Sequence, residues 1–313
     1  MECFERAGEV EITDISEFDL VKTFECGQCF RWNADENGVY TGVAYGRAAS
    51  LRCVGGSTAG SVGGSTAGSV GGSLFISGSL ADFEALWRHY FDLDRDYGEI
   101  RRRLCTDDFM REATEFGSGI RILRQDSWEA LCSFIISQCN NIPRIKKIIS
   151  TLCREFGEKL DFDPAPLHAS INASLGSSAP APHNAMFYSF PSAERLAGLS
   201  ENDLAPLRCG YRAEYILNAA RAVAEGRLDL DVLARGAPDQ ARLALKKLRG
   251  VGDKVADCTL LYGLNMLDAF PLDVWMKRAV AKRFGPGFDP GIFSPYAGLA
   301  QQYIFYHARS EKA

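Results

Sequence analysis

The pattern of apolar residues changes once along the 313-residue chain, near residue 80. Before this point, TFECGQCFRWN (23–33) and GVYTGVAYG (38–46) combine aromatic and β-branched residues with glycine, which is typical of strands. After it, apolar residues recur at helical spacing, as in ADFEALWRHYF (81–91). Strands followed by helices predict an α+β fold. We expect an antiparallel sheet domain over residues 1–110 and an all-α domain over residues 111–313.

Two low-complexity segments interrupt these domains. GGSTAGSV occurs at 55–62 and again at 63–70, followed by GGS, and contains no large apolar residue. Such a segment cannot bury a core, so we expect a loop over 55–73 that expands a hairpin between two strands. Residues 161–185 are rich in Pro, Ala and Ser, and predict an insertion loop in the helical domain.

Charge divides unevenly between the two expected domains. The net charge of −5 taken alone argues against a nucleic-acid binder. However, residues 1–112 hold 11 basic and 19 acidic residues, a net of −8, whereas the rest hold 24 and 21, a net of +3. Basic residues gather in three short clusters: Arg144, Lys146 and Lys147; Lys246, Lys247 and Arg249; Lys277, Arg278, Lys282 and Arg283. Local clusters favour phosphate binding, although any one is also typical of a solvated helix face.

The chain shows no sign of membrane insertion, secretion or metal binding. It has no run of about 18 apolar residues, and its acidic N-terminus is unlike a secretory signal. We therefore expect an intracellular protein with reduced cysteines. We also expect a monomer, located in the cytoplasm and nucleoid if the protein is bacterial and in the nucleus if it is eukaryotic. Cys26 and Cys29 lack a matching second pair, so neither a metal nor another cofactor is expected.

The segment 248–273, LRGVGDKVADCTLLYGLNMLDAFPLD, predicts a helix, a tight L-x-G-V-G hairpin and a second helix. Gly250 and Gly252 would let the backbone approach a ligand closely, since no Cβ intervenes. The second helix begins near Asp253, and its free N–H groups can bind phosphate. Helix–hairpin–helix binding of the DNA backbone is one interpretation. A glycine turn between core helices is the other.

Lys254 and Asp273 suggest chemistry at this hairpin. Lys254 falls in the first turn of the second helix, where the helix dipole disfavours a cation and so favours the neutral amine that a nucleophile requires. Cys258 lies on the same helix face. Asp273 follows at the start of another expected helix, where it can also act as an N-cap. Such a Lys–Asp pair suits base excision: the amine attacks the sugar, and the carboxylate stabilises positive charge.

Six sequence blocks, in order along the chain, resemble the 8-oxoguanine DNA glycosylase family of the helix–hairpin–helix superfamily. They are GQCFRW (27–32), FIISQCNNIPRI (134–145), GYRAEY (210–215), GVGDKVADC (250–258), PLDVWMKR (271–278) and PYAGLAQQYIF (295–305). The resemblance implies a TBP-like N-terminal sheet and a helix–hairpin–helix glycosylase domain. It also implies excision of 8-oxoguanine from double-stranded DNA, opposite cytosine, with abasic-site lyase activity.

The resemblance also implies residue roles. Lys254 would form the Schiff base and Asp273 would assist glycosidic cleavage. The Gly27 carbonyl would accept N7–H of 8-oxoguanine, which guanine lacks. The rest of the base pocket would be formed by the sandwiching Phe305 and Cys258, by Gln301 at the pairing edge, and by Tyr262, where vertebrate-type relatives have Met. Phe305, Cys258 and Gln301 could equally be ordinary core or surface residues, and only their joint spacing favours a pocket.

Other positions would contact DNA. The resemblance places Arg144, Arg212 and the wedge Tyr211 at the widowed cytosine, and further contacts at Gly250, Gly252, Val255 and Trp275. Trp275 replaces a His of many relatives. Cys139 replaces the Asn that fills the vacated space, so either Asn140 or Gln138 fills it or cytosine recognition is weaker. Two alternatives remain open: an alkylated-purine glycosylase, which would lack the Lys, and a non-catalytic DNA-binding module.

Overall fold

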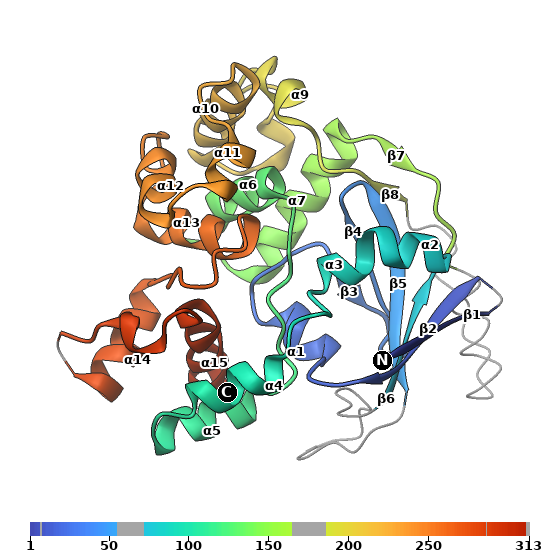
Figure 1. The fold of residues 1–313 in the computed structure, drawn as a ribbon. Helices are drawn as coiled ribbons and strands as arrows, with labels where there is room; N and C mark the ends of the chain where they lie inside the picture. Colours follow the sequence, from blue (N-terminus) through green and yellow to red (C-terminus); the bar gives the residue numbers. More distant parts are fainter. Residues whose placement is uncertain (7, 55–71, 165–185, 286, 311–313) are drawn as a thin grey trace.

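The computed structural model describes residues 1–6, 8–54, 72–164, 186–285 and 287–310. A twisted antiparallel sheet and its covering helices form one side of the molecule, and a larger group of helices forms the other (Figure 1). The expected α+β order, a sheet followed by helices, is confirmed.

The sheet has six antiparallel strands in the order β1-β2-β6-β5-β4-β3. Their bounds are β1 (Glu2–Arg6), β2 (Glu9–Ile15), β3 (Asn33–Ala34), β4 (Tyr40–Ala44), β5 (Arg47–Val54) and β6 (Gly72–Ser77). Strands β5 and β6 pair directly, with Leu51 opposite Ile76, so the repeat does connect two neighbouring strands. The expected loop over 55–73 was too long, because Gly72 and Ser73 belong to β6. The rest of the repeat, 55–71, lies outside the described residues.

The segment 23–33 is not a strand, so this part of the prediction was wrong. Residues Leu20–Glu25 form helix α1, and Asp19 caps it by accepting a hydrogen bond from the Lys22 N–H at 3.0 Å. A turn follows, and β3 begins only at Asn33. The aromatic residues that suggested a strand fill the core from the helix and the turn: Phe24 and Trp32 stack with ring centroids 4.7 Å apart.

Trp32 anchors the core beneath the sheet. Its side chain is 1% exposed, and its Nε1 donates to the Tyr90 hydroxyl at 2.9 Å. A Cβ at Gly42 on β4 would lie 2.3 Å from the Trp32 ring, so this strand position admits no larger residue. Tyr90 comes from the helical run expected over 81–91, which the structure forms as α2 (Leu80–Asp82), a π-helix (Phe83–Trp87) and α3 (Arg88–Tyr90).

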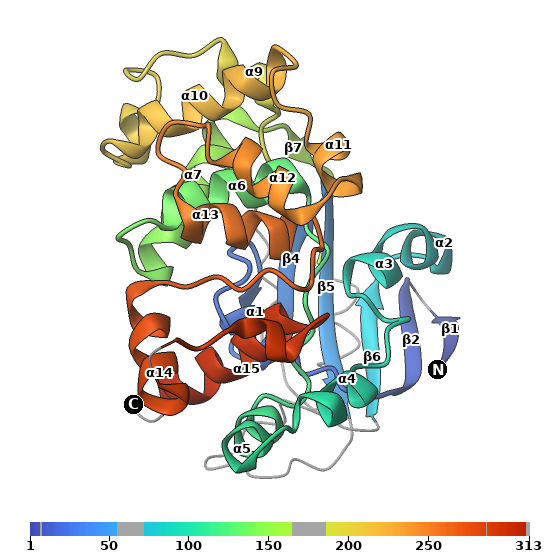
Figure 2. The ribbon, with the colours of Figure 1, turned by 60° about the vertical axis from the view of Figure 1, so that its left-hand side comes forward.

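The helices after residue 96 form the larger part, which Figure 2 shows from another side. They are α4 (Tyr97–Leu104), α5 (Asp108–Phe116), α6 (Ser127–Ser137), α7 (Ile142–Phe156), α9 (Ala193–Ala197), α10 (Arg212–Ala224), α11 (Leu230–Arg235), α12 (Pro238–Leu245), α13 (Asp253–Cys258), α14 (Val274–Phe284) and α15 (Ala297–Ser310). Their ends follow the sequence: Asp126 caps α6, Asn141 caps α7 with Pro143 in its first turn, and Gly157 ends α7. No helix in the described ranges is long and apolar enough to cross a membrane.

Among the residues that the structure describes, the helical part departs from an all-α domain at one place. Strand β7 (Lys159–Leu160) pairs with β8 (Phe187–Tyr188) at the two ends of the expected insertion loop. Residues 161–164 have no regular structure, and 165–185 lie outside the described residues. Helix α4, which precedes the expected boundary at residue 110, places Ile100 and Leu104 in the core of the helical part. The division at residue 110 stays a prediction.

Candidate active site

A small cavity of about 70 Å³ lies where α13, α15, the start of α14 and the turn after α1 meet. Helix α1 lies beside α15 in both views of the fold (Figures 1 and 2). The structure brings together in this lining all seven residues predicted for catalysis and base binding: Gly27, Lys254, Cys258, Tyr262, Asp273, Gln301 and Phe305. Cys26, Phe134, Pro271 and Gln302 complete it. Segments far apart in the sequence thus converge on one pocket.

Lys254 is part-buried in the first turn of α13, as predicted. Its Nζ donates to the Ser137 hydroxyl at 3.0 Å and lies 5.3 Å from the centre of the Phe134 ring. Phe134 and Ser137 are both on α6, one helical turn apart, and so share a face. These two contacts hold the amine at the cavity.

Asp273 both caps a helix and lines the pocket. Its Oδ1 accepts the Met276 N–H at 2.7 Å, which fixes the start of α14. Within the described residues its side chain makes no other hydrogen bond, so Oδ2 remains available. The two interpretations of this residue are therefore compatible.

Gln301 offers an unpaired hydrogen-bond acceptor to the cavity, whereas Cys258 offers a neutral thiol. Gln301 is 5% exposed, and its Oε1 is buried without a hydrogen-bond partner in the described part of the chain. A buried unpaired acceptor costs about 1–3 kcal/mol, which points to a ligand donor as its partner. Burial raises the pKa of the Cys258 thiol to about 11, so this residue is a neutral thiol near pH 7.

The two hairpin positions, 250 and 252, have different surroundings, so the lack of a side chain matters for a different reason at each. A Cβ at Gly250, where φ is +83°, would lie 2.2 Å from the Tyr215 ring, so packing inside the protein explains this glycine. A Cβ at Gly252 would meet nothing within 4 Å, which leaves open space in front of α13. The prediction of close ligand approach therefore fits Gly252, while Gly250 serves the fold.

Val255, an expected DNA contact, has a buried side chain. It is 3% exposed and belongs to the core of the helical part. The first N–H groups of any α-helix lack intrahelical partners, and no side chain caps those of α13. Any DNA contact at Val255 must use its backbone.

Arg212 is also more buried than expected of a residue that reads a base. It is 5% exposed, and its guanidinium donates to the carbonyl oxygens of Gln138, Cys139 and Cys209. These bonds join the loop after α6 to the loop before α10. In this structure Arg212 holds the loops together and offers few free donors.

The neighbouring residues form an exposed surface. Tyr211 is 50% exposed and lies over the Arg212 guanidinium, with the ring centre 4.6 Å from Cζ. Arg144 is exposed at the start of α7, and its Nη2 donates to the Arg208 carbonyl oxygen at 3.2 Å. Arg144 and Tyr211 are thus both accessible, and Arg144 contacts the loop that leads to Tyr211.

Cys139 is the exposed tip of the loop after α6. It has a φ of +46°, an uncommon value for a non-glycine residue. The amides of its neighbours are turned back to their own helix: Gln138 donates to the Ile135 carbonyl at 3.1 Å, and Asn140 to the Ile136 carbonyl at 3.2 Å. The structure therefore presents Cys139, rather than either neighbour, at this tip.

Comparison with known proteins places the chain in a family. Residues 12–131 match the N-terminal domain of 8-oxoguanine DNA glycosylase, and residues 132–287 match the HhH-GPD superfamily of base excision DNA repair proteins. An Arabidopsis thaliana N-glycosylase/DNA lyase is 32% identical over 93% of this chain and 77% of its own length. A Saccharomyces cerevisiae N-glycosylase/DNA lyase is 30% identical over 86% of this chain and 68% of its own. The chain belongs to the 8-oxoguanine DNA glycosylase family.

Two solved structures share the fold of this glycosylase over their whole lengths. MBOgg1 in complex with a low-affinity DNA ligand has 38% identity and a TM-score of 0.84, with 100% of this chain and 99% of that chain covered. The 8-oxoguanine glycosylase/lyase of Clostridium acetobutylicum, in complex with double-stranded DNA containing cytosine opposite 8-oxoguanine, has 32% identity, the same coverage and a TM-score of 0.83.

The remaining lining residues of the glycosylase pocket were missed by the sequence reasoning. Phe134 lies in the FIISQCNNIPRI block, where helical spacing relative to Ser137 could have indicated it. Gln302 follows Gln301 directly, and adjacent residues on a helix do not share a face, so spacing gave no signal. Trp275, an expected DNA contact, does not line the cavity; its ring packs edge-on against that of the lining residue Phe305, with ring centroids 5.9 Å apart.

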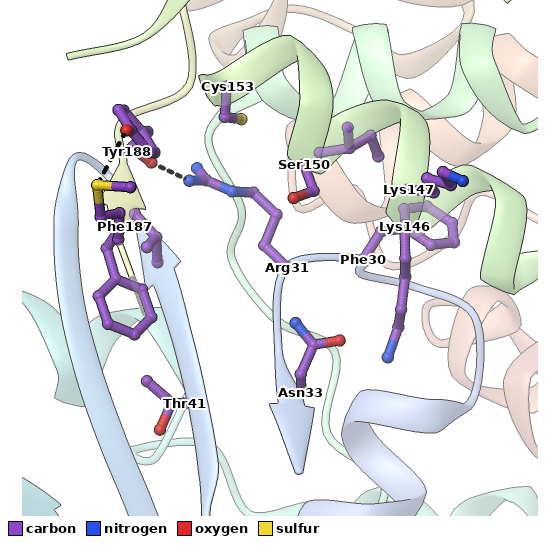
Figure 3. Close-up of a pocket in the computed structure, with 13 residues that line it drawn as sticks. Phe30, Arg31, Asn33, Thr41, Lys146, Lys147, Ser150, Cys153, Phe187 and Tyr188 are labelled. Carbon is purple, nitrogen blue, oxygen red and sulfur yellow. Dashed lines mark hydrogen bonds between the residues drawn. The ribbon is translucent and has the colours of Figure 1, made fainter. Parts of the chain in front are cut away.

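A larger cavity of about 370 Å³ lies away from Lys254, between α7, the sheet and β8 (Figure 3). Two of its three cations, Arg31 and Lys146, already have partners. Arg31 pairs with Glu129 at 3.1 Å and donates to the Tyr188 carbonyl, and Lys146 pairs with Glu25 at 3.2 Å. None of the predicted site residues lines this cavity, so we assign it no part in the reaction. The described residues contain no group of three potential metal ligands.

Proposed function

We propose that this glycosylase removes 8-oxoguanine from double-stranded DNA, opposite cytosine, and then cleaves the abasic strand. The observation that carries the proposal is the convergence of Lys254, Asp273 and the unpartnered Gln301 acceptor in one pocket beside a helix–hairpin–helix. The base must leave the stack to reach this pocket. DNA repair implies a protein inside the cell, in the nucleoid-containing cytoplasm of a bacterium or in a eukaryotic nucleus.

The chemistry begins with the Lys254 amine. Its lone pair attacks C1′ of the flipped nucleotide, the bond from C1′ to N9 breaks, and the base leaves with the bonding electrons and takes up a proton. The Asp273 carboxylate stabilises the positive charge that develops on the sugar. Ring opening gives a Schiff base between Nζ and C1′. Loss of a C2′ proton then expels the 3′ phosphate, which is β-elimination.

The pocket distinguishes the damaged base by hydrogen bonding. The Gly27 carbonyl would accept N7–H of 8-oxoguanine, and guanine has no hydrogen there. The Gln301 Oε1 would accept from the pairing edge, which supplies the donor that this buried atom lacks. Phe305 and Cys258 would lie on the two faces of the base. The cavity of about 70 Å³ is smaller than the ~300 Å³ of ordinary ligand sites, so lining side chains must move on entry.

The exposed surface formed by Arg144, Tyr211 and Cys139 would meet the strand opposite the lesion. Arg144 offers donors to the widowed cytosine, and Tyr211 can wedge beside it. The buried Arg212 would hold this surface in place through its hydrogen bonds to the Gln138 and Cys139 carbonyl oxygens. Because a thiol is a poor hydrogen-bonding group, Cys139 fills space without reading the cytosine edge.

A release assay tests the substrate. Duplexes containing 8-oxoguanine opposite each of the four bases, and a duplex containing 3-methyladenine, would be incubated with the protein under single-turnover conditions. We expect release of 8-oxoguanine, fastest opposite cytosine, together with strand cleavage. Release of 3-methyladenine alone would instead favour an alkylated-purine glycosylase, and salt-sensitive binding without release or cleavage would favour a non-catalytic DNA-binding protein.

A further inference from the structure

The turn at residues 26–28 is held on both sides of Gly27 by buried glutamine side chains. Gln302 on α15 donates from Nε2 to the Cys26 carbonyl oxygen at 3.1 Å. Gln125 donates from Nε2 to the Gln28 carbonyl oxygen at 2.7 Å. Gly27 lies between these anchored carbonyls with a φ of +89°, which L side chains rarely adopt. The carbonyl groups before and after the proposed base-reading carbonyl are therefore both fixed.

Both glutamines are held in turn by Tyr262. The Tyr262 hydroxyl donates to Oε1 of Gln302, and this bond orients the amide so that Nε2 faces the turn. The backbone N–H of Gln125 donates to the backbone carbonyl of Tyr262 at 3.2 Å. Two hydrogen-bonded arms thus run from one tyrosine to the two sides of Gly27.

Tyr262 also belongs to the helical segment that carries Lys254. Helix α13 continues into a π-helix (Thr259–Gly263), which includes Tyr262. The Tyr262 ring stacks on Phe134 at 5.2 Å, and the Lys254 amine lies over the same Phe134 ring. Tyr262 therefore links the turn at residues 26–28, which carries the proposed base-reading carbonyl, to the proposed nucleophile Lys254.

The arms are buried well enough to hold this geometry. Tyr262, Gln302 and Gln125 are 4%, 1% and 7% exposed. Water cannot readily replace a hydrogen bond at such burial, so each group keeps its protein partner.

Resting on the proposed function, we propose that Tyr262, Gln302 and Gln125 are positioning residues for base recognition. They set the distance from the Gly27 carbonyl to the Lys254 amine, so that N7–H of 8-oxoguanine meets its acceptor when C1′ meets its nucleophile. These three residues contribute to recognition of the base, so cleavage of a preformed abasic site, which has no base, does not depend on them.

Two variants and a matched control test this proposal. Tyr262→Phe removes one hydroxyl and breaks the Gln302 arm at its origin, and Gln302→Met removes both hydrogen bonds of that arm with little change in shape. Tyr303→Phe is the control: Tyr303 neighbours Gln302, is 0% exposed, and its hydroxyl has no partner in the described part of the chain. Each protein would be assayed on an 8-oxoguanine·cytosine duplex and on a duplex with a preformed abasic site, with its melting temperature measured alongside.

We expect base excision by Tyr262→Phe and Gln302→Met to fall at least about tenfold relative to abasic-site cleavage, as loss of a positioned hydrogen bond implies. Tyr303→Phe should keep the wild-type ratio. Equal losses on both substrates, or an unchanged ratio in both variants, would overturn the positioning role. If Gln302→Met does not fold, the single-atom change in Tyr262→Phe decides. A wild-type protein that cleaves abasic sites but leaves 8-oxoguanine in place would refute the proposed function instead.

Discussion

Asp273 combines a structural and a proposed chemical role in one side chain, because one carboxylate oxygen caps α14 while the residue lines the pocket. Residues of this kind are hard to assign from sequence, since an aspartate before a helix is explained fully by capping. In the structure, Oδ1 makes the cap, and Oδ2 has no hydrogen-bond partner among the described residues.

Substitution of Asp273 by Asn or Ala should separate the roles by experiment. Asn remains a good N-cap, so Asp273→Asn should melt near the wild type, whereas Asp273→Ala should lose about 1 kcal/mol of stability. Both should lose the charge that stabilises the sugar cation, so single-turnover excision should fall at least about 100-fold. Thermal unfolding and excision of 8-oxoguanine give the two readings. Asp273→Asn with near wild-type excision would exclude a role for the charge.

Replacement of Gln301 should lower excision without lowering stability, whereas replacement of an ordinary core residue lowers stability. Its Oε1 has no partner within the described residues, so Gln301→Leu removes an unsatisfied acceptor, and the free protein should be as stable as the wild type or up to about 1 kcal/mol more stable. Excision of 8-oxoguanine should nevertheless fall about tenfold, because the pairing edge loses its acceptor. Urea unfolding and excision kinetics measure both. A destabilised variant with normal excision would mean that Gln301 serves only the fold.

At the scale of elements, the parts of the site that have local signals could be predicted from the sequence. The hairpin glycines, Lys254 in the first turn of α13 and Asp273 before α14 all follow from spacing. Helix α1 was missed because aromatic residues suit a strand and a buried helix alike, and only the Asp19 cap distinguishes them. The burial of Arg212 was missed because the Gln138 and Cys139 carbonyls that it binds lie in the loop after α6, far away in the sequence, and leave no mark in the local sequence.

The two hairpin glycines should respond differently to the same substitution. Gly250→Ala places a Cβ against Tyr215 at a positive φ, so stability should fall by more than about 1 kcal/mol. Gly252→Ala meets open space, so stability should be nearly unchanged, while affinity for undamaged duplex DNA should fall because the backbone phosphate can no longer approach α13. Urea unfolding and fluorescence anisotropy on labelled DNA would show this contrast. Wild-type DNA affinity in Gly252→Ala would contradict close approach at the hairpin.

At the scale of the whole molecule, charge is distributed unevenly along the chain. The first 112 residues carry a net charge of −8 and the remainder +3, and the pocket and hairpin residues other than Cys26 and Gly27 belong to the remainder. We therefore expect the DNA to lie against the helical side. The total charge of −5 conceals this arrangement, which a count by region reveals.

Asp92 links the two parts through an ion-pair cluster and should make stability depend on pH. Burial alone would raise its pKa, but the hydrogen bonds and charges of Arg95 and Arg124 outweigh burial and hold the pKa below its usual value. Its contribution should be complete above about pH 4, near the unfolded-state pKa, and should be lost as pH falls through the lower folded-state pKa. Asp92→Asn should cost about 3–5 kcal/mol at pH 7, because two arginines lose their charged partner.

Urea unfolding between pH 2 and pH 7 measures this effect. The difference in stability between the wild type and Asp92→Asn should shrink as the pH is lowered below about 4. A difference that stays constant over this range would show that the Asp92 charge does not stabilise the fold.

Borohydride trapping tests the central claim, that Lys254 forms a Schiff base with the sugar of a damaged nucleotide. The wild-type protein should form a covalent adduct with a duplex containing 8-oxoguanine opposite cytosine, and an undamaged duplex should give none. Lys254→Gln should bind the damaged duplex and give no adduct. Release of 8-oxoguanine by the wild type without an adduct, or an adduct of equal yield from Lys254→Gln, would contradict the account.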